Sequence, residues 1–93
     1  MADVRDKYKQ LAEFIHSFGF TVDNVSQGYT WYITLRHILK NYELQVDLNN
    51  KTFDIDLHNS RYTHGMALEL IDDLHIMKVL AQYTLELFKE FKR

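Results

Sequence analysis

The chain has 93 residues, of which 46% are hydrophobic, 14% aromatic and 26% charged, a composition that argues against disorder and predicts a single domain, residues 1–93, with one modest core. It contains no cysteine, which excludes disulfides, thiolate metal sites and cysteine nucleophiles and suits a cytoplasmic protein. The formal net charge of −2 gives no general attraction to nucleic acid or to an anionic membrane, and we recognise neither a signal peptide nor a membrane-spanning apolar run.

The first predicted element is a helix that starts after Asp3, a suitable N-cap residue, and stops at Gly19. Between these positions apolar residues recur every three or four positions, which is the spacing of a single buried helix face. The residues of this face are Val4, Tyr8, Leu11, Ala12, Ile15 and Phe18. Polar residues occupy the other side, so we expect this helix to pack on one face only.

From residue 20 onward the hydrophobic pattern changes to alternation, which is typical of strands. It predicts a strand over 20–25, a turn at 26–28 and a strand over 29–35. A second hairpin is clearer, with strands over 42–48 and 52–57. The apolar residues of this second hairpin are Tyr42, Leu44, Val46, Leu48, Phe53, Ile55 and Leu57.

The turn of the second hairpin is predicted at Asn49-Asn50, because asparagine tolerates the positive φ of a two-residue type I′ turn. Such a turn places Val46 opposite Phe53 and puts all apolar residues of the hairpin on one face. Residues 36–41, between the two hairpins, fit either a tucked loop or the end of a longer hairpin. The outer face of the sheet would carry Thr30, Tyr32, Thr34, Glu43, Gln45, Asp47, Thr52, Asp54, Asp56 and His58.

The last predicted element is a helix from Asp72 to Arg93 that contains neither glycine nor proline. Its apolar residues cover an arc of roughly 240°, whereas an ordinary surface helix has an apolar stripe of about 100°. Residues 65–71 do not continue the phase of this arc, so we expect them to form a separate short element. Asp72 or Asp73 would then cap the final helix.

The apolar arc of the last helix is too wide for a single contact. Its densest part should lie on the sheet: Met77, Leu80, Leu87, Phe88 and Phe91. The first helix can cover one of the two flanks, which are Ile76, Val79 and Tyr83 on one side and Leu74, Ala81 and Leu85 on the other. An uncovered apolar flank is typical of an interface, most simply that of a two-fold homodimer. The candidate interface residues are Leu74, Ile76, Val79, Tyr83 and Leu85. Alternatively, residues 59–71 fold over this flank.

The order helix, four strands, helix predicts an α+β fold, in which both helices pack on one face of a four-stranded antiparallel sheet made of two hairpins. Catalytic motifs are missing from the sequence: no serine lies in a glycine-flanked elbow, and the three glycines form no phosphate-binding loop. We therefore expect a non-enzymatic interaction or regulatory protein without a cofactor.

Two other functions remain open. The outer face concentrates the carboxylates of Glu43, Asp47, Asp54 and Asp56, which could attract a basic partner if the chain were an inhibitor or mimic that blocks a nucleic-acid-binding site of a larger protein. Alternatively, Asp54, Asp56 and His58 lie at alternate positions of one strand and could converge on manganese, iron or zinc.

Overall fold

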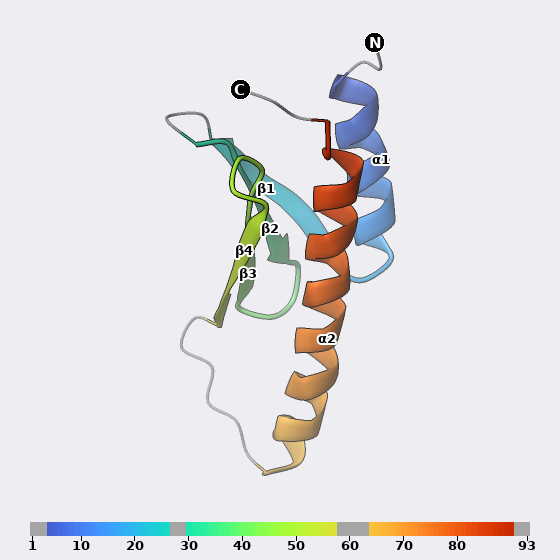
Figure 1. The fold of residues 1–93 in the computed structure, drawn as a ribbon. Coiled ribbons are helices and arrows are strands. Elements are labelled where there is room, and N and C mark those ends of the chain that lie inside the picture. Colours follow the sequence, from blue (N-terminus) through green and yellow to red (C-terminus); the bar gives the residue numbers. More distant parts are fainter. Residues whose placement is uncertain (1–3, 27–29, 58–63, 91–93) are drawn as a thin grey trace.

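The computed structural model, which describes residues 4–26, 30–57 and 64–90, has the predicted α+β fold (Figure 1). The elements in chain order are α1 (Val4–His16), β1 (Phe20–Ser26), β2 (Tyr32–His37), β3 (Tyr42–Asp47), β4 (Thr52–Leu57) and α2 (His64–Leu87). All neighbouring strands are antiparallel, in the order β1-β2-β3-β4. Both helices contact the sheet, α1 through β1 and α2 through β3.

α1 ends at His16, three residues before Gly19, and Gly19 has the left-handed backbone expected of a stop signal, with a positive φ of 83°. A Cβ atom at this position would also lie 2.9 Å from Nε2 of His37, so both the backbone conformation and the space require glycine. Leu11 and Ile15 are fully buried, whereas Phe18 is 38% exposed. The predicted N-cap, Asp3, lies outside the described residues.

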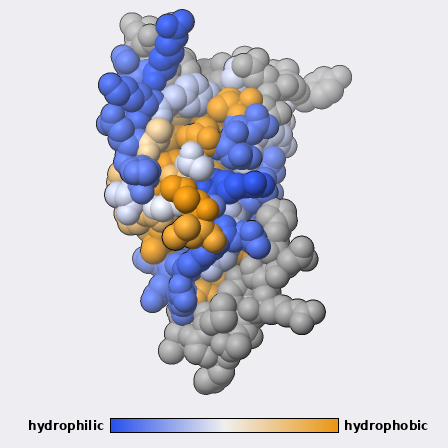
Figure 2. Space-filling view, turned by 180° about the vertical axis from the view of Figure 1, so that it is seen from behind, coloured by the Kyte–Doolittle hydropathy of each residue, from blue (hydrophilic) through white to orange (hydrophobic). Residues whose placement is uncertain are grey.

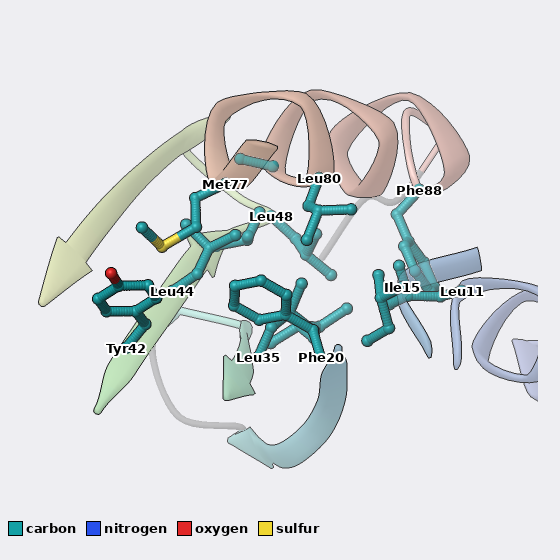
Figure 3. Packing of buried hydrophobic residues seen from close by; sticks show 13 residues of the cluster. Leu11, Ile15, Phe20, Leu35, Tyr42, Leu44, Leu48, Met77, Leu80 and Phe88 are labelled. Carbon is teal, nitrogen blue, oxygen red and sulfur yellow. The ribbon is translucent and has the colours of Figure 1, made fainter. Parts of the chain in front are cut away.

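The core is one cluster between the helices and the inner face of the sheet, and Figure 3 shows its side chains converging from all three sides. From α1 come Leu11 and Ile15, from α2 come Met77 and Leu80, and Phe88 directly follows α2. The sheet contributes Phe20, Ile33, Leu35, Tyr42, Leu44 and Val46, and Leu48 follows β3. Every one of these side chains is at most 4% exposed, so the inward pattern of the strands is confirmed.

The inward side chains of β4 are much less buried than those of β3. On β3 the inward residues Tyr42, Leu44 and Val46 are at most 4% exposed. They pair in the predicted register with Leu57, Ile55 and Phe53 on β4. These three partners are only half-buried. The helix layer therefore covers β3 completely and β4 only in part.

The turn of this hairpin differs from the prediction. β3 ends at Asp47 and β4 begins at Thr52, so four residues connect the strands instead of two. Only Lys51 among them has a positive φ, of 59°, which excludes a type I′ turn at Asn49-Asn50. The carboxylate of Asp47 explains the longer turn, because its Oδ1 accepts the backbone N–H groups of Asn49 (3.0 Å) and Asn50 (2.9 Å).

The first hairpin is shifted relative to the prediction. β2 runs from Tyr32 to His37 instead of over 29–35, and residues 38–41 form the loop to β3. Residues 27 and 28 of the predicted turn lie outside the described part of the chain. Thr34, predicted on the outer face, is only 6% exposed.

The last helix is longer at its start and shorter at its end than predicted. α2 begins at His64, so the separate element at 65–71 and the cap at Asp72 or Asp73 are wrong, and it ends at Leu87. A 24-residue helix is about 36 Å long, whereas a six-residue strand spans about 20 Å. The first turns of α2 consequently extend beyond the sheet (Figure 1). Within residues 65–71, Glu69 departs from the apolar phase because its carboxylate accepts a hydrogen bond from Lys40 of the loop between β2 and β3.

The left-handed backbone at Lys51 provides a test of the hairpin geometry. Because a side chain at this φ is strained, Lys51→Gly should raise the free energy of unfolding by about 0.5–1 kcal/mol in urea denaturation. Lys51→Ala keeps the Cβ atom and should give no such gain. Equal stability of the two variants would contradict the strained turn.

Candidate interaction surfaces

The two flanks of α2 lie in different environments. Tyr83 stacks on Phe14 of α1, with ring centroids 3.9 Å apart and an interplanar angle of 15°. On the same flank, Ile76 is half-buried against the core and Val79 is 36% exposed. This flank faces α1, and Tyr83 belongs to the contact between the two helices.

The opposite flank of α2 is turned away from α1. At about 100° per residue, Leu74 and Leu85 point in nearly the same direction, about 180° from Tyr83. Both are half-buried, and Ala81 between them is fully buried. Ile71, one turn before Leu74, is 61% exposed. We call Ile71, Leu74 and Leu85 the outer flank of α2.

The predicted acidic face is reduced to three carboxylates. Asp54 and Asp56 are exposed on β4, and Glu43 pairs with Asp56 across the strands. Arg36 lies near Glu43, with Nη2 and Oε2 3.8 Å apart. Asp47 is a wrong prediction for this face, because it is 8% exposed and its carboxylate holds the β3–β4 turn.

Two of the three residues of the metal hypothesis lie in the described part of the chain. Asp54 and Asp56 do lie on one side of β4, but His58 is outside the described residues. Within residues 4–26, 30–57 and 64–90, no three histidine or carboxylate side chains gather as a metal site would require.

A polar cluster that the sequence analysis missed ties the β2–β3 loop to α2. Lys40 Nζ donates to Oδ2 of Asp73 (2.7 Å) and to Oε1 of Glu69. The hydroxyl of Tyr42 donates to the same Asp73 oxygen (2.8 Å). The hydrogen bonds to Asp73 and Glu69 raise the pKa of Lys40. Glu69 and Asp73 are four residues apart on one helix face, and this spacing was the sequence signal for a shared cation.

His37 organises the same loop from inside. Its Nδ1 accepts the backbone N–H groups of Leu39 and Lys40, both at 3.0 Å, so the ring is neutral and carries its proton on Nε2. The ring also meets Phe20 edge to face, with centroids 4.9 Å apart. Burial lowers the pKa of His37, the charge of Lys40 lowers it further, and Asp73 opposes both.

The loop exposes two large aliphatic side chains. Ile38 is 56% exposed and Leu39 88%. Residues 36–43 also line an open cavity. Figure 2 shows hydrophobic residues reaching the surface in the middle of one side of the molecule, surrounded by hydrophilic residues.

No protein-family model matches this chain, and neither does any curated protein or solved structure. In the described part of the chain, neither helix combines the length and the apolar character needed to cross a membrane.

The loop geometry predicts that stability depends on the ionisation of His37. Because its pKa is lowered in the folded state, the unfolded chain binds more protons as the pH falls through the ordinary histidine range. The contribution of His37 to the free energy of unfolding should therefore be greatest above about pH 6.5 and decrease below it. Urea denaturation between about pH 7.5 and 5 measures this decrease.

Two histidine variants separate His37 from the other titrating groups. His37→Asn keeps an acceptor oxygen without a proton equilibrium in this range, so it should flatten the decrease. His75→Asn, on the exposed side of α2, should leave the decrease unchanged. An unaltered pH profile in His37→Asn would contradict the proposed role of this ring.

Proposed function

We propose that this chain is a small, non-enzymatic protein-interaction module of the cytosol that self-associates through the outer flank of α2. The observation that carries the proposal is that this flank is apolar but not enclosed. Ile71 is 61% exposed, and Leu74 and Leu85 are half-buried. Apolar side chains gathered at the surface of a soluble protein mark an interaction site, and the lack of cysteine suits a reducing compartment.

The spacing of the outer flank suits a two-fold contact. Leu74 and Leu85 lie about three turns apart on one side of α2. In an antiparallel contact between two copies, Leu74 of each copy can pack against Leu85 of the other, so one apolar contact occurs twice.

The geometry of the loop cavity supports a non-enzymatic role. His37 is the histidine that lines it, and its Nδ1 already accepts two backbone N–H groups. Its Nε2 lies against Gly19, where even a Cβ atom would be 2.9 Å away. A general base must reach the proton that it abstracts, and neither ring nitrogen is free to do so.

The acidic inhibitor or mimic is supported less well than self-association. Of its four predicted carboxylates, that of Asp47 accepts backbone hydrogen bonds within the β3–β4 turn, and that of Glu43 lies beside Arg36. Exposed Asp54 and Asp56 are too few to imitate the closely spaced phosphates of a nucleic acid. The negative charge of these two residues nevertheless favours a basic partner at β4.

A pair of substitutions on opposite flanks tests self-association. Leu85→Arg would place a charge in a desolvated contact and should weaken the dimer at least tenfold, measured by sedimentation equilibrium, while the fold is kept. Tyr83→Arg should instead lower the free energy of unfolding by about 2–3 kcal/mol, because it removes the stack on Phe14.

If Leu85→Arg also lowers the stability of the fold, other variants can still test self-association. Ile71→Glu changes the most exposed residue of the flank and should split the dimer without loss of stability. Asp72→Arg, at an exposed site about 160° from Leu74 around α2, is the control and should leave the dimer intact. A native chain that stays monomeric at several hundred micromolar would contradict self-association.

A further inference from the structure

The outer edge of β4 is a regular strand edge. β4 is the last strand of the sheet, and within the described residues no other strand pairs with its outer side. Alternate residues of such an edge direct their N–H and C=O groups outward, where another strand can pair with them. β4 pairs with β3 through all six residues without a shift, whereas the other edge strand, β1, is interrupted between Val22 and Asn24. A bulge discourages further pairing, so β4 is the better template.

The inner side of β4 lacks apolar cover. Phe53, Ile55 and Leu57 are half-buried, although their partners on β3 are almost completely buried. A strand added to β4 would place alternate side chains beside these three residues, on the side of the helix layer. Apolar side chains at those positions would complete the core that ends at β4.

The outer side of β4 is acidic. Asp54 and Asp56 are exposed there, at alternate positions. Opposite charges across neighbouring strands are favourable and like charges are unfavourable. If β4 paired antiparallel with a second copy of itself, with both apolar sides facing the helices, Asp54 would meet Asp54 or Asp56 of that copy. A second copy is therefore a poor occupant, and a basic strand is a good one.

We propose that the outer edge of β4 binds an extended segment of another protein, in which apolar residues alternate with lysine or arginine. The segment pairs through its backbone, turns its apolar side chains toward the helix layer and sets its basic side chains beside Asp54 and Asp56. This is strand addition to an exposed sheet edge. It extends the proposed interaction role to a second surface, because self-association uses α2 and strand addition uses the edge of the sheet.

A capped octapeptide of alternating valine and lysine is a suitable probe. It should bind saturably, and the amide signals of β4 should show the largest NMR shifts. Peptides in which glutamate replaces lysine, or in which the valines and lysines are grouped in blocks, should not bind. Equal binding of the block peptide would overturn the proposal, because charge attraction alone does not require alternation.

A charge reversal makes the test specific to β4. Asp54→Lys should weaken the valine–lysine peptide about fivefold or more and allow the valine–glutamate peptide to bind, because the outer pairs change sign. Asp23→Lys, at an exposed site on β1, makes the same change in net charge and is the matched control. Equal weakening by both variants would overturn the proposal.

Repeating the titration in Ile71→Glu separates the two surfaces. Peptide binding should persist in this variant whether or not the native chain forms a dimer. If Ile71→Glu abolished peptide binding while the fold stayed intact, the peptide would bind at α2, and the assignment to β4 would be wrong.

Discussion

In the β3–β4 hairpin, almost completely buried residues of β3 face partners on β4 that are only half-buried, although the two strands carry the same apolar pattern. The difference in burial arises from the helix layer, in which α2 packs on β3 and α1 on β1. Apolar side chains at the margin of the helix layer keep part of their contact with water, and covering them is favourable by about 25 cal/mol per Å². Both proposed contacts, at the outer flank of α2 and at the edge of β4, follow from this incomplete cover.

The length of α2 adds a second constraint. Leu70 and Leu74 pack against the core from the first part of α2, and polar contacts add to this packing. Lys40 joins Glu69 and Asp73, and Tyr42 shares the Asp73 carboxylate. The β2–β3 loop has to keep a defined shape for this, and His37 maintains it by accepting two backbone N–H groups. Besides its core residues, α2 is thus positioned by an ion pair near the surface and by the loop that a neutral histidine shapes.

Sequence periodicity predicted the element order, the α+β class and the register of the second hairpin, because alternation and helical spacing reflect local burial. It failed where a side chain serves a distant partner. Asn49 was interpreted as a turn residue with positive φ, yet its Oδ1 accepts the backbone N–H of Trp31 at 2.6 Å. Asp47 counted as surface charge, but its carboxylate holds the turn. Residues 65–71 were predicted to be a separate element, although Glu69 among them belongs to α2 and pairs with Lys40. Most of these contacts join residues far apart in the chain, and no local pattern records them.

Amide hydrogen exchange of the native chain at low micromolar concentration tests the uneven cover most directly. Amides of β2 and β3 should be the most protected, and alternate amides of β4 should exchange much faster because their N–H groups point to the open edge. Uniform protection of the β4 amides, equal to that of β3, would mean that another segment already covers the edge of β4. This result would contradict the incomplete cover of the sheet, from which both proposed contacts follow.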